Sequence, residues 1–392
     1  MRHRVTRTAA TALLAAVVLL GCAPAGTSSI PAPSATATPR ITPTPTPTPT
    51  PDAVEAAVSE MGTAAQAASV VMGHIPSADP AAVRAYMASG FGGFILMGAN
   101  VAGDAQQLRE LTAAVTIDPE LPPLIAIDQE GGVVSRMPWD DLPAGRALQQ
   151  ANAAQTRDAF ARRAALVADA GANVNFGIVA DVPANAGSFI SSRALGADPT
   201  AAAERVAAAV EGESGVVLST LKHFPGHGAA PGDSHHSIPT TPMTLDAWHA
   251  ADAKPFVAGI DAGAELLMFG HLAFTAVDAA PASLSPKWHA IARDDLGFDG
   301  VMITDDLGML TSSGVAAYRD PVENAVHALV AGNDMVLMVA GSTPETASAM
   351  VAGIVAAVDG GRLSPERLQD AAEHVMELRM QLADAATDGV EP

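Results

Sequence analysis

The strongest constraint on the fold is a regular alternation of short apolar runs with longer helical stretches, which extends over most of the chain. The short runs are rich in β-branched residues, as buried parallel strands are. There are eight of them, at residues 69–73, 93–97, 124–128, 174–180, 215–222, 265–270, 300–305 and 334–339. Helical stretches lie between them, for example at 155–170, 200–213, 245–262, 344–358 and 365–382. This alternation predicts an α/β fold of the (β/α)8 TIM-barrel type, formed by a single domain.

An open, doubly wound sheet is the main alternative, because it is built from the same strand and helix units. Its dinucleotide-binding form needs a Gly-x-Gly-x-x-Gly sequence directly after a strand. No such sequence follows any of the predicted strands, so the barrel is favoured.

The N-terminal part of the chain is expected to lie outside the barrel. Three arginines precede an apolar run that ends at Leu20, which is the pattern of a secretory signal and too short for a stable transmembrane helix. A segment rich in proline and threonine follows, and its composition cannot bury enough apolar surface to order itself. We expect a lipoprotein signal peptide at 1–21, a linker at 22–54, the barrel domain at 55–386 and a tail at 387–392.

Cys22 is the only cysteine, so no internal disulfide bond can form. The Leu-Leu-Gly-Cys sequence that ends at Cys22 resembles the lipobox of bacterial lipoproteins. This resemblance implies that Cys22 becomes the lipidated first residue of an extracytoplasmic protein anchored to the cell membrane. An ordinary signal peptide with a chance cysteine is the alternative.

The charge balance argues against one class of partner. The formal net charge is -21, with 42 acidic residues against 21 basic ones. Nucleic-acid binding depends on clustered lysine and arginine that neutralise phosphates. We therefore expect no nucleic-acid partner.

Polar residues gather where the predicted strands end. In a barrel the carboxyl ends of the strands meet at one face, and that face carries the chemistry. Ordinary loop polarity would not place ionisable groups after this many strands. The residues concerned are Asp128, Arg193, Lys222, His223, His271 and Asp305.

The richest stretch runs from Lys222 to His236 and holds four histidines and Asp233. Histidine clusters can bind zinc, but the prolines and glycines here predict a loop without the fixed spacing of a helical metal motif, so we expect no metal. Asp233 lies two residues before His235, close enough to orient its imidazole and stabilise the charged form. Because histidine titrates near neutrality, it can both give and take a proton.

Two neighbouring acids, Asp305 and Asp306, follow the seventh predicted strand. An acid in this position can be a nucleophile, a metal ligand or the cap of the next helix. Since a helix could begin at Leu307, capping is a serious alternative for Asp306. For Asp305 we favour a chemical role over helix capping.

Together these segments resemble glycoside hydrolase family 3, in its single-domain β-N-acetylglucosaminidase branch. The resemblance rests on Lys-His-Phe-Pro-Gly-His-Gly at 222–228, Asp-Ser-His at 233–235, the segment 299–307, and Asp-Gln-Glu-Gly-Gly at 128–132. It covers roughly residues 55 to 382. The family commonly has arginine after the two glycines, where this chain has Val133, and we expect a change in packing or electrostatics near the pocket.

The resemblance implies a retaining, two-step reaction on sugars that contain β-linked N-acetylglucosamine. Asp305 would be the nucleophile, and His235, oriented by Asp233, would be the acid and then the base. No cofactor is required. The residues that would bind the sugar are Asp128, Arg136, Arg193, Lys222 and His223, with His271 read as lining the site.

Other functions stay open at this point. A neutral histidine base repels phosphate less than a carboxylate does, so a β-N-acetylglucosaminide phosphorylase is one alternative. A non-catalytic cell-wall-binding lipoprotein and a β-glucosidase are two more. The lipobox and the linker make peptidoglycan fragments the natural substrate, with chitin-derived sugars as the other choice.

Overall fold

The computed structural model describes residues 50–101 and 103–388. The expected signal peptide at 1–21, Cys22 and the greater part of the expected linker lie outside the described residues. All the elements below belong to one unit that spans Thr46–Pro392.

Eight parallel strands form the central sheet, and each pairs with the next one along the chain. A parallel bridge between Ile303 and Met335 joins the last two strands, so the sheet closes into a barrel. This confirms the TIM-barrel prediction. The strands are β1 (Val71–Gly73), β2 (Gly93–Leu96), β3 (Leu124–Ile127), β6 (Val174–Val179), β7 (Leu218–Phe224), β9 (Leu266–Phe269), β11 (Val301–Thr304) and β12 (Val336–Leu337).

The predicted strands agree closely with the observed ones. Seven predicted runs each contain their strand, and only β7 extends beyond its run, by two residues to Phe224. Four short strands lie outside the barrel and pair as a β4–β5 hairpin and a β8–β10 pair. They are β4 (Gln129–Gly131), β5 (Val134–Ser135), β8 (Thr240–Thr241) and β10 (Ala273–Phe274).

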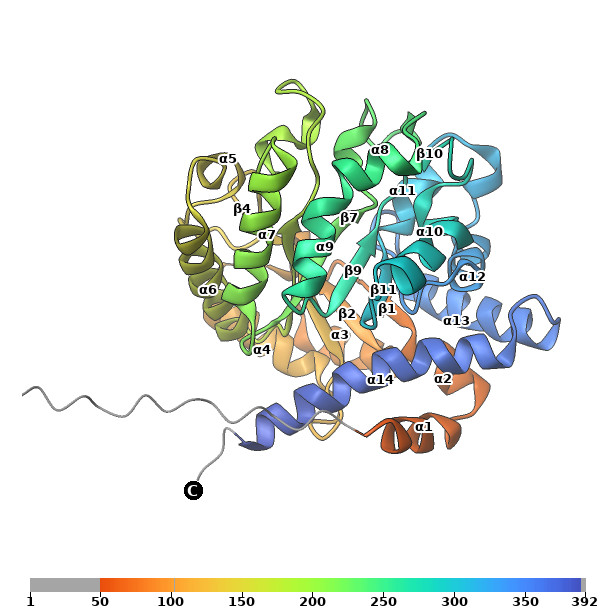
Figure 1. The fold of residues 1–392 in the computed structure, drawn as a ribbon. Coiled ribbons are helices and arrows are strands. Elements are labelled where there is room, and N and C mark those ends of the chain that lie inside the picture. Colours follow the sequence, from red (N-terminus) through yellow and green to blue (C-terminus); the bar gives the residue numbers. More distant parts are fainter. Residues whose placement is uncertain (1–49, 102, 389–392) are drawn as a thin grey trace, which may run out of the picture. The chain divides into compact units, whose positions relative to one another are not determined.

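Helices surround the barrel (Figure 1). They are α1 (Pro51–Ser59), α2 (Thr63–Ser69), α3 (Pro80–Met87), α4 (Ala105–Val115), α5 (Gly145–Leu148), α6 (Ala153–Asp169), α7 (Pro199–Glu213), α8 (Leu245–Ala250), α9 (Ala253–Asp261), α10 (Pro286–Ala290), α11 (Leu307–Ser312), α12 (Pro321–Ala331), α13 (Pro344–Asp359) and α14 (Pro365–Asp388). Among the residues that the structure describes, no helix is both long and apolar enough to cross a bilayer.

Two of the differences between the predicted and the observed helices are explained by proline. The stretch 245–262 is two helices, because the ring of Pro255 would clash with the carbonyl of Ala251 in a continuous helix. Helix α1 begins at Pro51, before the expected domain start at 55, because proline is favoured in the first helical turn. At the other end of the chain, α14 continues to Asp388, past the expected helix end at 382 and the expected domain end at 386.

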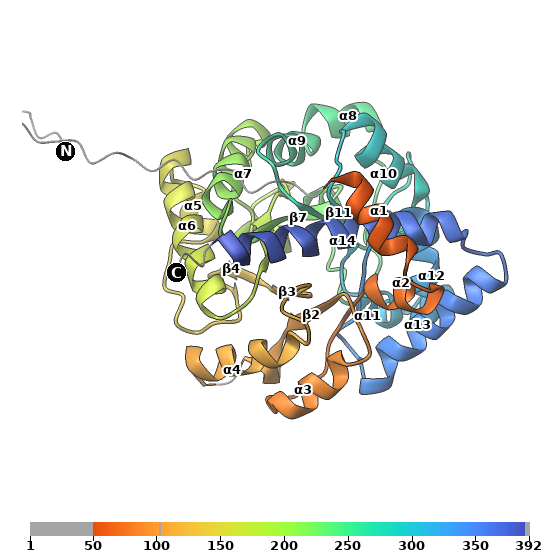
Figure 2. The same cartoon turned by 90° about the horizontal axis from the view of Figure 1, so that it is seen from below.

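The barrel is filled and closed at one end. Apolar side chains from all eight barrel strands meet in the barrel interior, and β7 contributes Leu218 from its first position. Val375 and Leu378 of α14 belong to the same apolar cluster. Helix α14 crosses beneath the amino-terminal ends of the strands (Figure 2). Access to the barrel is therefore from the opposite end, where the strands finish.

Near the base of β7 the structure buries an acid that takes no part in the candidate site. Glu213, at the end of α7, has no exposed surface, and its Oε1 accepts a hydrogen bond from Asn175 Nδ2 at 2.6 Å. Burial raises the pKa of Glu213 to about 8, against the effect of that hydrogen bond. The carboxyl group is therefore protonated in the folded protein at neutral pH.

This burial predicts a pH-dependent stability. A carboxyl group with a raised pKa stabilises the fold below its unfolded pKa of 4.5, and this contribution is lost as the pH rises through about 8. Between these limits the group should lower the free energy of unfolding by up to about 1.4 kcal/mol per pH unit. Glu213→Gln cannot ionise and should show a weaker pH dependence, measured by urea denaturation across this window. The exposed Glu211→Gln on the same helix is the control, and equal slopes in wild type and Glu213→Gln would contradict the prediction.

Candidate active site

A cavity of about 250 Å³ opens at the carboxyl ends of the barrel strands. Of the eight residues predicted for catalysis or sugar binding, seven line it, and Asp233 does not. The seven are Asp128, Arg136, Arg193, Lys222, His223, His235 and Asp305. The structure thus brings together side chains that are up to 177 positions apart in the chain, from Asp128 to Asp305.

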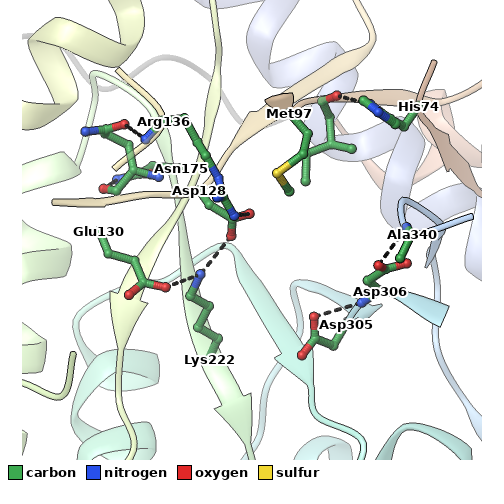
Figure 3. Close-up of polar contacts among 12 residues, drawn as sticks. His74, Met97, Asp128, Glu130, Arg136, Asn175, Lys222, Asp305, Asp306 and Ala340 are labelled. Carbon is green, nitrogen blue, oxygen red and sulfur yellow. Dashed lines mark hydrogen bonds and ion pairs between the residues drawn. The ribbon is translucent and has the colours of Figure 1, made fainter. Parts of the chain in front are cut away.

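A buried ion cluster forms one wall of the cavity (Figure 3). The Lys222 ammonium lies 2.8 Å from Asp128 Oδ1 and 2.7 Å from Glu130 Oε1. Burial alone would raise the pKa of Asp128, but Lys222 and Arg136 outweigh it and hold this pKa well below its usual range. Lys222 and Arg193 lower the pKa of Glu130 in the same way, against the effect of burial. Both acids are therefore ionised, and their remaining lone pairs can accept hydrogen bonds from sugar hydroxyl groups.

Two arginines extend this cluster. Arg136 Nη2 donates to Asp128 Oδ2 at 3.0 Å. Arg193 holds Glu130 in a bidentate contact, with Nε to Oε2 at 2.9 Å and Nη2 to Oε1 at 2.7 Å. Because Arg193 lies directly after a short helix at Phe189–Ser192, this contact joins the loop after β6 to the β4–β5 hairpin.

The β4–β5 hairpin positions Arg136 through Gln129. The buried amide of Gln129 accepts the backbone N–H groups of Arg136 and Met137, each at 3.0 Å. Gly131 sits at the turn with φ of 80°, and a Cβ there would come within 2.4 Å of the Arg163 guanidinium. Gly131 is therefore required by the turn and by its close packing.

Val133 lies at the tip of this hairpin, and 72% of it is exposed. Its neighbour Val134 lines the cavity, whereas Val133 does not. The change expected near the pocket is thus confined to the outer surface of the hairpin, and Arg136 keeps its contact with Asp128.

Asp305 comes at the end of β11 and lines the cavity floor. Its backbone N–H donates to the Phe269 carbonyl at 2.9 Å, and its Oδ1 accepts the N–H of Asp306 at 2.8 Å. Burial raises the pKa of Asp305, but His223, His271 and this N–H outweigh burial, so the pKa is lowered overall. Asp305 is therefore an ionised carboxylate held by the barrel.

Asp306 has the capping role considered above. It caps α11 by accepting the N–H of Gly308 at 2.8 Å, and it also accepts the N–H of Val339. A third hydrogen bond comes from the N–H of Ala340 (Figure 3). Burial raises its pKa to about 6. Asp306 thus joins α11 to the segment after β12, next to the nucleophile candidate.

His271 does not line the cavity, so the interpretation of it as a site-lining residue was wrong. Its Nδ1 pairs with Ser283 Oγ at 2.7 Å, and its Nε2 with the Asp306 carbonyl at 2.9 Å. The ring is buried, and it fixes the backbone that follows Asp305.

His235 and Asp233 form a hydrogen-bonded pair on the loop after β7. Asp233 Oδ1 lies 2.5 Å from His235 Nδ1, and it also accepts the backbone N–H of His235 at 3.0 Å. The contact uses Nδ1 and leaves Nε2 for a substrate. The His235 side chain is 57% exposed and that of Asp233 is 43% exposed, so the pair stands at the cavity entrance.

Sequence reasoning missed two buried acids of this site. Glu130 was read as part of a motif without a role of its own, although it pairs with both Lys222 and Arg193. Asp181 lies two residues after β6, and its Oδ2 contacts His223 Nδ1 at 2.7 Å. The rule that polar residues at strand ends mark the site could have found Asp181, because it comes directly after the run 174–180.

Within 50–101 and 103–388, one group of possible metal ligands lies close enough to share an ion, formed by Asp334, Asp370 and His374. It is not part of the cavity. Its central carboxylate, Asp334, is already paired with Arg293 and Arg367. These two cations make the group a poor metal site.

Comparisons with known proteins agree with this geometry. Residues 65–378 match the model of the glycosyl hydrolase family 3 N terminal domain. A β-hexosaminidase of Stenotrophomonas maltophilia (strain K279a) is 38% identical over 258 residues, which is 63% of this chain and 75% of that protein.

Solved structures show the same likeness. A glycoside hydrolase family 3 β-N-acetylglucosaminidase from Paenibacillus sp. str. FPU-7 matches with a TM-score of 0.77 and 30% identity, over 85% of this chain and 64% of that one. A β-N-acetylhexosaminidase from Beutenbergia cavernae DSM 12333 matches with a TM-score of 0.72 and 30% identity, over 82% of this chain and 99% of that one. The chain therefore belongs to glycosyl hydrolase family 3, a family of glycosidases.

Proposed function

We propose that this protein is a retaining β-N-acetylhexosaminidase that removes β-linked N-acetylglucosamine from peptidoglycan- or chitin-derived sugars. The observation that carries the proposal is that the Asp305 carboxylate and the His235 imidazole line the same cavity. A nucleophile and a proton donor at one cavity are the two groups that a retaining reaction needs. The names of the relatives described above support the N-acetylhexosamine specificity.

The reaction would proceed in two balanced steps. Asp305 attacks the anomeric carbon and forms an ester bond as the C1–O bond breaks, while His235 transfers its proton to the departing oxygen. His235 then takes a proton from water, whose oxygen attacks the anomeric carbon and releases Asp305. The lowered pKa of Asp305 keeps the nucleophile ionised, and Asp233 stabilises the charged imidazole before each proton transfer to the leaving group.

Two kinds of lining residue suit different parts of an N-acetylglucosamine unit. The ion cluster of Asp128, Glu130 and Lys222 offers directed hydrogen bonds to hydroxyl groups. The cavity also has apolar lining residues, which would accept the acetyl methyl group. They are Ile95, Met97, Val134, Phe189, Met268, Met309, Leu337 and Val339.

The cavity also limits how much of a substrate it can enclose. Its volume of about 250 Å³ falls below the roughly 300–1,000 Å³ of sites for drug-sized ligands. We infer that it encloses a single sugar unit and that the rest of the substrate extends past His235 at the entrance.

The direct test is turnover of a nitrophenyl β-N-acetylglucosaminide with and without phosphate. We expect release of free N-acetylglucosamine at a rate that phosphate does not change. A sugar 1-phosphate product with a rate that depends on phosphate would identify a phosphorylase instead. Absence of turnover, with retained binding of the sugar, would favour a non-catalytic cell-wall-binding protein.

Removal of the nucleophile should abolish the covalent intermediate. We expect Asp305→Ala to form no adduct with an activated fluorinated N-acetylglucosaminide, as measured by intact-mass spectrometry. Asp299→Asn is the control, because Asp299 is exposed and precedes β11; it should label as wild type does. A labelled Asp305→Ala protein would show that another residue is the nucleophile.

Removal of the acid should affect poor leaving groups most. We expect His235→Ala to slow the hydrolysis of chitobiose by on the order of 10²–10⁴-fold, the range of general acid catalysis, and to slow a nitrophenyl substrate far less. Steady-state kinetics on both substrates measure the ratio, with the neighbouring, exposed His236→Ala as control. Equal losses on the two substrates would exclude an acid role.

We also propose that Cys22 anchors the protein by a lipid to the outer face of the cell membrane, with residues 22–49 as a spacer. The lipobox-like sequence and the Pro/Thr composition support this location. Cys22→Ser should move the protein from the detergent phase to the aqueous phase in detergent partitioning of cell extracts. An unchanged distribution would contradict the anchor.

Product analysis on muropeptides beside chitobiose would identify the preferred substrate.

A further inference from the structure

Asp181 is a fully buried acid that does not line the cavity but contacts His223, which does. It lies two residues after β6. The N–H of Ala180 donates to the Lys222 carbonyl at 2.8 Å, which continues the pairing of β6 with β7 beyond the register shift between Asn175 and Ile178. The Asp181 carboxylate therefore lies beside His223. Its Oδ2 contacts His223 Nδ1 at 2.7 Å, and its Oδ1 accepts the N–H of His227 at 2.5 Å.

The contacts of the His223 ring define its tautomer. His223 Nε2 lies 3.3 Å from Arg193 Nη2. An arginine has only donors, so the hydrogen in this contact comes from Arg193 and His223 Nε2 accepts it. Burial holds the pKa of His223 well below its usual value, so the ring is neutral and carries one proton. That proton is on Nδ1 and points to Asp181.

We propose that Asp181 is a positioning residue, which fixes His223 as the tautomer with a proton on Nδ1 and an acceptor at Nε2 in the sugar site. The inference rests on the proposed function for its catalytic meaning, because His223 is there expected to bind a sugar hydroxyl. The single lone pair of Nε2 accepts from Arg193 here, and in the complex it can accept from a sugar hydroxyl that takes the place of Arg193. The other tautomer would instead present a donor to the Arg193 donor beside it.

The same carboxylate holds the start of the catalytic loop. Asp181 receives the backbone N–H of His227 as well as the ring of His223. The loop then packs on the chain after Asp181, where a Cβ on Gly228 would lie 1.9 Å from the Val182 carbonyl oxygen. Asp181 thus connects a sugar-binding ring to the base of the loop that carries Asp233 and His235.

The first experiment reads the tautomer without substrate. Nitrogen NMR of the histidine-labelled protein distinguishes protonated from unprotonated ring nitrogens, and His223→Gln identifies the His223 signals by their loss. We expect wild-type His223 to carry its proton on Nδ1. A proton on Nε2 would overturn the proposal, and this arm needs no Asp181 variant that folds.

The second experiment uses Asp181→Asn. The amide oxygen of this variant should accept the His227 N–H, which leaves the amide NH2 group facing His223 Nδ1. Because the NH2 group is a donor, the His223 ring proton should move from Nδ1 to Nε2. We expect kcat/KM on the nitrophenyl substrate to fall by about 10- to 100-fold, in analogy with metal-binding histidines, for which loss of the orienting carboxylate has an effect of this size. Thermal unfolding of the variant verifies its fold.

Asp252→Asn is the matched control. Asp252 is a second buried acid beside the loop, and a Cβ on Gly226 would lie 3.3 Å from its Oδ1. It has no contact with the His223 ring among the interactions of the described residues. We expect the His223 tautomer and the kcat/KM of the Asp252→Asn variant to match those of wild type.

The outcomes separate the two proposals. A swapped tautomer together with reduced kcat/KM in Asp181→Asn, but not in Asp252→Asn, supports the role of Asp181. An unchanged tautomer or an unchanged kcat/KM in Asp181→Asn overturns it, and so does an equal loss in Asp252→Asn. If wild type cleaves no N-acetylglucosaminide, the proposed function fails, while the ring spectra still decide whether Asp181 fixes His223.

Discussion

The candidate site depends on the ion pairs that the buried Lys222 ammonium group makes with Asp128 and Glu130. The Lys222 side chain is 2% exposed and bridges Asp128 and Glu130, which themselves are held by Arg136 and Arg193. A charge this deeply buried is tolerated only when paired and hydrogen-bonded, and removal of one partner from such a group typically costs about 3–5 kcal/mol. The cluster therefore requires β3, the β4–β5 hairpin, the β6 loop and β7 to keep their relative positions.

This rigid wall contrasts with the entrance of the cavity. Asp305 is held by backbone contacts at the end of a barrel strand, and His271 and Asp306 fix the chain that follows it. His235 and Asp233 instead stand on a loop with about half of each side chain exposed. The nucleophile candidate is thus fixed by the fold, whereas the proton donor is fixed by its own acid partner. Such an arrangement lets a substrate enter before the donor makes its contact.

The fold could be predicted because buried parallel strands have a simple signature. Each strand lies in a short apolar run, several of which are rich in β-branched residues, and the closed barrel follows from eight such runs in order. The break between α8 and α9 was missed because the helical pattern was continuous across Pro255, and only the clash with the Ala251 carbonyl divides it. The start of α1 was missed because Pro51 belongs in composition to the linker and in conformation to the helix.

Site residues were predictable where a strand end or a specific motif marked them. Asp128, Lys222 and Asp305 were found in this way, and all three line the cavity. Glu130 and Asp181 were missed because their importance lies in partners that are distant in sequence, Arg193 for the first and His223 for the second. His271 was misassigned for the related reason that strand-end position does not say which way a ring points.

The proposed function requires that Asp305 and His235 act on opposite ends of one C1–O bond in one cavity. The most direct measurement is a crystal structure with a sulfur-linked N-acetylglucosamine disaccharide that the enzyme cannot cleave. We expect the Asp305 carboxylate to lie against the anomeric carbon and His235 Nε2 to lie within hydrogen-bond reach of the linking atom, on the other side of the sugar. A sugar bound with its anomeric carbon away from Asp305, or with the linking atom facing a residue other than His235, would contradict it.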